Sequence, residues 1–138
     1  MTALAEIEER LGMPGVTSDE DLARIVETRL PTKVVKALIE SGVYDTEVYA
    51  LVIPRRTLAH RMARREPLSQ DESDRAVRVA RITALAAHVF NEPGRAWKWL
   101  RKPAKRFDHR TPMDMLRTEA GARLIEEMLY QLDEGFFA

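Results

Sequence analysis

The segment IPRRTLAHRMARR, residues 53–65, holds five arginines and no acidic residue. Pro54 suits the first turn of a helix, because the N–H that proline lacks has no partner there. With about 100° of rotation per residue, Leu58 and Met62 fall on one side of such a helix. The opposite side carries Arg56, His60 and Arg64. The arginines therefore do more than border an apolar stripe, and the segment predicts a cationic helix.

The chain before this segment predicts three short helices and no strand. Thr17 to Glu20 has the spacing of a capping box, in which a hydroxyl accepts an N–H and Glu20 reaches back. Leu30-Pro31 ends that helix, and Thr32 is expected to cap the next one, which stops at Ser41-Gly42. A third helix starts at Asp45 or Thr46 and runs to Leu51.

A short helix, a tight turn and a cationic helix form the arrangement by which a helix-turn-helix protein reads the DNA major groove. If the cationic helix enters the groove, its geometry assigns base contacts to Arg56, Thr57, His60 and Arg61. Arg64 shares their face, while Arg55 and Arg65 reach phosphates or pair with acids inside the protein. The alternative is that these arginines only form a solvated face. On DNA, a homodimer would place two such helices about one helical turn apart.

Composition limits the class of protein. With 138 residues, 45% of them hydrophobic, the chain can bury the core of one domain or two small ones. It has no cysteine, which fits a reducing cytosol, and its first residues carry acids where a signal peptide carries bases. No apolar stretch approaches a membrane span. We expect a cytoplasmic protein with an N-terminal arm at 1–16, a helix-turn-helix domain at 17–67 and a second helical domain at 68–138.

The charges are clustered although they sum to zero. Residues 55–65 carry a net charge of +5 and residues 95–110 carry +6, while residues 1–30 and 111–138 carry −4 each. Binding to nucleic acid depends on local lysines and arginines that displace counterions from phosphates. A neutral total therefore does not exclude DNA as a partner.

The longest predicted helix begins near Leu68 and runs to Phe90. Ser69 and Glu72 have the spacing of a capping box, and residues 76–90 are apolar on most sides. Two explanations stay open. Part of this surface meets a second copy of the chain in a homodimer, or the helix is the central one of a single bundle.

The last third predicts a short helix at 95–100 and an amphipathic helix that ends at Gly135. Trp97 and Leu100 are expected in the core, and Trp99 is expected as a surface anchor. Thr111 and Thr118 are the expected helix caps. The end of the chain, Phe136-Phe137-Ala138, needs a cover, either from the protein's own core or from a cleft in a partner.

Nothing in the sequence indicates an enzyme. His60, His88 and His109 lie far apart and beside no acid or cysteine at metal-ligand spacing. The sequence has no glycine-rich phosphate loop, nucleophile elbow or HExxH motif. We therefore expect no catalytic residue, no metal and no cofactor.

Three motifs in residues 53–138 together carry a resemblance to a known family. They are the basic helix that leads into LSQDESDR, the segment RAWKWLRKP, and the segment RTPMDMLRTEAG. In this order they resemble the Xre/MbcA/ParS antitoxins, whose C-terminal part is a toxin-binding domain. Residues 17–52 are similar, more loosely, to the Xre helix-turn-helix domain.

The resemblance implies a bacterial type II antitoxin that neutralises a RES-domain toxin, which consumes NAD, by direct contact. It also implies repression of its own operon through operator DNA. In the family, the C-terminal region of the antitoxin obstructs the active-site cleft of the toxin. Carried onto this chain, the toxin contacts are Leu129, Leu132, Gly135, Phe136, Phe137 and Ala138, together with Trp99, Arg101 and Lys102. The alternatives are a helix-turn-helix transcriptional regulator without a toxin partner and a helical scaffold.

The chain departs from the family pattern at two places. A typical helix-turn-helix has a glycine in the turn and a small alanine four residues earlier, where this chain has Val52 and Val48. A β-branched residue is poorly suited to a positive φ, so we expect a different turn geometry. Family members also often carry glycines before the TP pair, where this chain has residues 107–110, FDHR.

Overall fold

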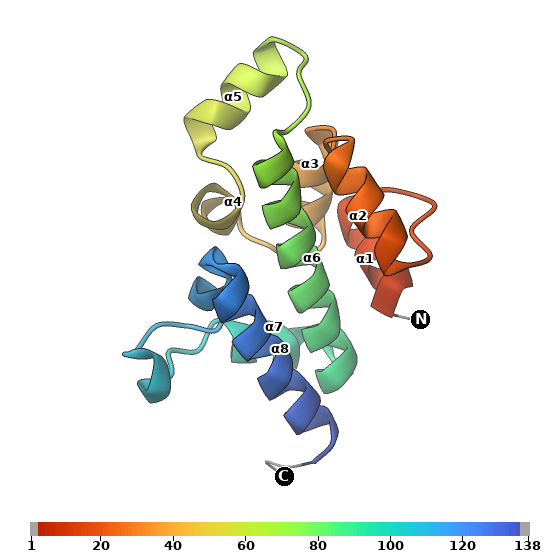
Figure 1. Ribbon diagram of the computed structural model, residues 1–138. Helices are drawn as coiled ribbons and strands as arrows, with labels where there is room; N and C mark the ends of the chain where they lie inside the picture. The colour runs from red at the N-terminus through yellow and green to blue at the C-terminus, as the bar shows by residue number, and fades with distance from the viewer. Residues whose placement is uncertain (1–2, 136–138) are drawn as a thin grey trace. The chain divides into compact units, whose positions relative to one another are not determined.

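The computed structural model describes residues 3–135, which fold into eight α-helices and two 3-10 turns without a strand (Figure 1). This confirms the all-α fold class. The chain divides into two compact units between Ala80 and Arg81. Within residues 3–135, no helix is both long enough and apolar enough to cross a membrane. The elements are α1 (Ala3–Leu11), α2 (Asp19–Glu27), α3 (Lys33–Glu40), α4 (Asp45–Leu51), α5 (Arg55–Ala63), α6 (Gln70–Phe90), α7 (Pro93–Leu100), η1 (Lys105–Phe107), η2 (Asp114–Arg117) and α8 (Glu119–Asp133).

The first helix, α1, was not expected from the sequence, where residues 1–16 were treated as an arm. It packs against α3, and its side chains Ile7 and Leu11 are buried in the core of the first unit. Their i, i+4 spacing is the signal that sequence reasoning missed. The carboxylate of Glu8 accepts hydrogen bonds from the N–H groups of Gly15 and Val16, both at 3.0 Å. These bonds fix the connection to α2.

The capping box of α2 lies one residue later than predicted. Ser18 is the N-cap, and its hydroxyl accepts the N–H of Asp21 at 3.1 Å. Asp21, rather than Glu20, reaches back and accepts the hydroxyl and the N–H of Thr17 at 2.7 and 2.9 Å. These hydrogen bonds lower the pKa of Asp21 from 3.8 to about 2.

The next two helices begin where the sequence predicted. Thr32 is the N-cap of α3 by position, but its side chain makes no capping hydrogen bond, which corrects the expected role of its hydroxyl. The helix α4 begins at Asp45, and the N–H of Tyr44 donates to the carboxylate of Glu47 at 2.8 Å.

The turn between α4 and α5 contains no residue in the left-handed region. Val52 has a φ of −115°, as expected for a β-branched residue that replaces the usual glycine. Val48, Val52 and Ile53 are all buried, so the side chains that stand in and before the turn are part of the core of the first unit. The predicted departure from the usual turn geometry is confirmed.

The helix α6 begins at Gln70 behind the predicted capping box. The N–H of Ser69 donates to the Glu72 carboxylate at 2.7 Å, and the N–H of Glu72 donates to the Ser69 hydroxyl at 3.1 Å. The apolar side chains along this helix are already buried in the single chain, among them Ala76, Val79, Ala80, Ile82, Ala84 and Ala86. They therefore give no reason to require a second copy, and the homodimer stays a prediction.

In the second unit, α7 begins at Pro93, two residues before its predicted start. Pro93 occupies the first helical position, where proline is well tolerated. Leu100 is buried as predicted, whereas Trp97 is only partly buried and lies under the guanidinium of Arg101, 4.3 Å from the ring centre.

The helix α8 begins and ends as predicted. The hydroxyl of Thr118 accepts the N–H of Gly121 at 3.0 Å, and Gly135 follows the last turn with a φ of 83°. Thr111 is not the N-cap that was predicted, because the next element has Met113 in that position, although the Thr111 hydroxyl accepts the N–H of Asp114 at 3.1 Å. This element is the short 3-10 turn η2, which packs against α8.

The loop before η2 keeps a left-handed backbone without glycine. Asp108 and His109 have φ values of 55° and 64°, in the region that usually favours glycine. The loop is closed by the N–H of Ala104, which donates to the carbonyl of Arg110 at 3.0 Å, and by the buried ring of Phe107.

Candidate functional sites

The helix α5 presents a cationic face to solvent. Its nine residues include only one buried side chain, Leu58, and Figure 1 shows the helix, in yellow-green, joined to α4 and α6 by short connections. Thr57 is partly buried. The other side chains of the predicted DNA-contacting set, apart from Arg61, are exposed: Arg55, Arg56, His60 and Arg64. Three of these lie at i, i+4 and i+8, so one face of the helix carries them together.

Arg61, which was predicted to contact DNA bases, is engaged inside the first unit. Its Nε and one terminal nitrogen donate to the two carboxylate oxygens of Glu72 at 3.2 and 3.3 Å, and the other nitrogen donates to Glu66 at 3.4 Å. The side chain is 25% exposed. Glu72 lies eleven residues further along the chain, in another helix, so a helical wheel of α5 alone could not reveal this contact.

The inward edge of α5 therefore differs from the predicted one. Leu58 and Met62 were expected on one apolar side, but Met62 is 60% exposed. The inward edge instead contains Leu58 and Arg61, which are spaced i, i+3, and Arg61 forms an ion pair with Glu72 of α6.

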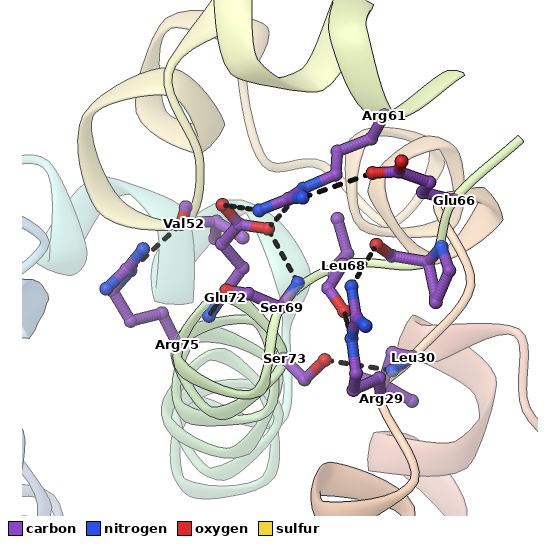
Figure 2. Close-up of polar contacts among 11 residues, drawn as sticks. Arg29, Leu30, Val52, Arg61, Glu66, Leu68, Ser69, Glu72, Ser73 and Arg75 are labelled. Carbon is purple, nitrogen blue, oxygen red and sulfur yellow. Dashed lines mark hydrogen bonds and ion pairs between the residues drawn. The ribbon is translucent and has the colours of Figure 1, made fainter. Parts of the chain in front are cut away.

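Glu72 and the segment around it belong to a connected polar network (Figure 2). Burial raises the pKa of the Glu72 carboxyl, but hydrogen bonds from the Ser69 N–H and from Arg61 outweigh this effect and hold the pKa below its usual value. The same hydrogen bonds to Glu72 raise the pKa of Arg61. The ion pair is therefore fully charged at neutral pH.

A second group of predicted residues lies on and after α7. Trp99 is only partly exposed, because its ring packs against Phe90 with the ring centres 5.7 Å apart. Arg101 is partly buried over Trp97, while Lys102 is exposed. Of these three toxin contacts predicted by resemblance, Lys102 is the most accessible.

The predicted contacts on α8 divide into core and surface. Leu129 is fully buried in the second unit, so its side chain stabilises α8 and is not available to a partner, which corrects its predicted role. Leu132 is partly exposed and Gly135 is exposed. Phe136, Phe137 and Ala138 lie outside the described residues.

Two exposed features lie near these residues, and sequence reasoning missed the first of them. Tyr130 on α8 is 51% exposed, although a tyrosine in an amphipathic helix gives no clear signal of which way it faces. The loop of residues 104–110 exposes Lys105, Arg106 and Arg110, and the clustered charge of residues 95–110 was the signal for it. In residues 3–135, no three His, Cys, Asp or Glu side chains are grouped so that they could hold a metal ion.

Two family matches cover the chain in the order of its units. Residues 21–81 match the family described as the Antitoxin Xre-like helix-turn-helix domain. Residues 85–135 match the family described as the Antitoxin Xre/MbcA/ParS C-terminal toxin-binding domain.

Individual relatives agree with these matches. The chain is 44% identical to the Antitoxin Xre of Pseudomonas putida over 133 residues, which are 96% of this chain and 83% of that protein. It is 32% identical to the Antitoxin Xre of Yersinia enterocolitica over 62% of this chain and 59% of that protein. A protein of a Sphingobium species named Prs ADP-ribosylating antitoxin is 28% identical over 64% of this chain and 62% of its own length. The chain therefore belongs to the Xre antitoxin family, with an Xre-like helix-turn-helix domain followed by a toxin-binding domain.

Proposed function

We propose that this antitoxin neutralises a RES-domain toxin, an enzyme that consumes NAD, by direct contact through its C-terminal region. The match of residues 85–135 to a toxin-binding domain is the observation that carries this proposal. The name of the Sphingobium relative refers to ADP-ribosylation, which favours a toxin whose substrate carries ADP-ribose, as NAD does.

The toxin-facing surface in this proposal is the end of α8 together with the segment that follows α7. Leu132 is partly exposed in the last turn of α8, Gly135 is exposed just after it, and residues 136–138 add two phenylalanines. Such a tail suits an apolar cleft, because burial of a phenylalanine side chain contributes about 1.5–3 kcal/mol. Trp99, Arg101 and Lys102 contribute further contacts. The tail then inhibits the toxin by occupying the cleft that NAD must enter.

The same protein represses its own operon in this proposal, with α5 as the DNA-reading helix. The support is the exposed cationic face of α5 and the match of residues 21–81 to a helix-turn-helix domain. An arginine can bind the O6 and N7 atoms of guanine with two hydrogen bonds, whereas the remaining cations bind phosphates. A homodimer would place two copies of α5 on successive major grooves. The residues assigned to DNA are Arg55, Arg56, Thr57, His60 and Arg64.

The toxin half is tested by producing the full chain together with the RES-domain protein encoded beside it. We expect the two proteins to purify as a complex in which NAD hydrolysis is suppressed. Removal of residues 136–138 should restore NAD consumption. Inhibition that is unchanged in the shortened chain would refute the tail mechanism, and a chain that never binds the toxin would refute the proposed function.

The DNA half is tested with the double change Arg56→Ala and Arg64→Ala. Both side chains are exposed, so the fold should be retained. We expect binding to a duplex from the promoter of the operon to be lost while inhibition of the toxin persists. Promoter binding that survives both changes would show that α5 is not the DNA-reading helix.

A further inference from the structure

The helix α5 is attached to its unit by little apolar contact. Leu58 is its only buried side chain, and it is itself 9% exposed. A helix held at one apolar point can tilt and rotate about that point, because few packing contacts oppose the motion. A DNA-reading helix needs the opposite property, since base contacts depend on a fixed angle in the groove.

The ion pair between Arg61 and Glu72 supplies the missing constraint. The guanidinium binds the carboxylate through two nitrogens, at 3.2 and 3.3 Å, and this two-point geometry fixes orientation as well as distance. The side chain of Glu72 is a fixed anchoring point for Arg61, because it is only 8% exposed and its carboxylate also accepts the N–H of Ser69.

The start of α6, which carries Glu72, is also held by residues 29 and 30. The hydroxyl of Ser73 accepts the N–H of Leu30 at 2.8 Å, and the N–H of Leu68 donates to the carbonyl of Leu30 at 2.9 Å. Arg29 donates to the carbonyls of Pro67 and Leu68 at 3.1 and 2.8 Å. Figure 2 shows these contacts gathered around the start of α6.

The first turns of α6 also hold the turn that precedes α5. The Nε of Arg75 donates to the carbonyl of Val52 at 2.9 Å. This carbonyl belongs to the turn where a valine replaces the usual glycine. Residues 72 and 75 of α6 therefore hold α5 at two places, the turn before it and its last turn.

We propose that Arg61 is a positioning residue whose ion pair with Glu72 sets the angle at which α5 presents Arg56, Thr57, His60 and Arg64 to DNA. Arg61 itself reads no base. This inference rests on the DNA half of the proposed function, and it assigns a DNA-binding effect to Glu72, an acidic side chain that repels DNA.

The test measures the binding of full-length variants to a promoter duplex and to an unrelated duplex of equal length, at several salt concentrations. We expect Glu72→Gln to weaken promoter binding about tenfold or more. Binding to the unrelated duplex and the salt dependence should change little, because every phosphate contact is retained. Asp71→Asn is the matched control, since Asp71 is exposed in the same turn of α6, and this change should leave promoter binding equal or slightly tighter.

The double change decides whether Arg61 acts through Glu72. If it does, Arg61→Gln should weaken promoter binding strongly in the parent chain and hardly at all in the Glu72→Gln chain. Additive losses, or a salt dependence that falls by about one phosphate contact in Arg61→Gln, would mean that Arg61 touches DNA and would overturn the proposal. Tighter promoter binding by Glu72→Gln would overturn it equally.

Two further measurements separate the other outcomes. Arg61→Lys keeps the charge but loses the two-nitrogen fork, so weakened promoter binding by this variant supports positioning even if Glu72→Gln fails to fold, and parent-like binding refutes it. Toxin inhibition should be retained by every folded variant. If Arg56→Ala with Arg64→Ala weakens promoter binding and Glu72→Gln does not, only the positioning role fails. If none of these changes affects promoter binding, the proposed role of α5 in DNA binding is refuted, and the positioning role of Arg61 is refuted with it.

Discussion

Replacement of Gly121 by alanine should destabilise the second unit, although alanine is the better helix former. Gly121 lies in the first turn of α8, and its N–H donates to the hydroxyl of Thr118. A Cβ atom added there would lie 2.0 Å from the carbonyl oxygen of Met115 and 3.1 Å from the Thr118 hydroxyl. The nearest of these atoms belongs to the backbone and cannot rotate away like a side chain, so η2 or the start of α8 must move. This close approach gives a physical reason for the glycine in the segment RTPMDMLRTEAG.

The size of the effect follows from two opposed contributions. Alanine in place of glycine in a helix gains about 1 kcal/mol. Insertion of a methyl group into a filled space costs about 1–3 kcal/mol, and a clash with a rigid backbone atom falls at the upper end of that range. The net loss is about 2 kcal/mol, which lowers the Tm by roughly 4–8 °C in a chain of this size. Thermal unfolding followed by circular dichroism measures it.

Gly94→Ala is the matched control. Gly94 also lies in the first turn of a helix, α7, but a Cβ atom there meets nothing within 4 Å. Its replacement should leave the Tm unchanged or raise it, because the gain in helix propensity adds up to about 1 kcal/mol to the free energy of unfolding. A Gly121→Ala variant at least as stable as the parent chain would refute the close-approach reasoning.

Two further predictions concern stability. The double change Asp108→Gly and His109→Gly should raise the free energy of unfolding by about 1 kcal/mol, because relief of two left-handed residues exceeds the entropy cost of glycine; a lower Tm would contradict this. Asp21→Asn should lower the free energy of unfolding, and the loss should be greatest above a pH of about 4, where Asp21 of the parent chain is ionised in the folded and the unfolded state. The difference between variant and parent should shrink as the pH falls to about 2, because Asp21 then becomes protonated in both states. Unfolding with urea across this pH range measures it, and a difference that persists at the lowest pH would show that the charge is irrelevant.

Local signals in the sequence predicted much of the fold. The capping box of Ser69 and Glu72, the cap at Thr118 and the stop at Gly135 depend on residues within one turn, and all three are confirmed. The same logic failed at Thr32, whose hydroxyl makes no capping bond. Spacing alone cannot tell which of several adjacent polar residues takes the cap.

Contacts between distant parts of the sequence could not be predicted. The wheel of α5 placed Leu58 and Met62 together, but the partner that orients this helix is Glu72 in α6. Leu129 was assigned to the toxin by family resemblance, yet it is fully buried. An amphipathic pattern shows which residues share a face, and only the packed structure shows how much of that face stays open.

The proposed neutralisation is tested most directly by the NAD content of cells that produce a RES-domain toxin with or without this chain. We expect the toxin alone to deplete NAD, the full chain to preserve NAD, and the Glu72→Gln variant to preserve it equally, because α5 has no part in the proposed contact with the toxin. Depletion of NAD that is the same with and without the full chain would contradict the central claim.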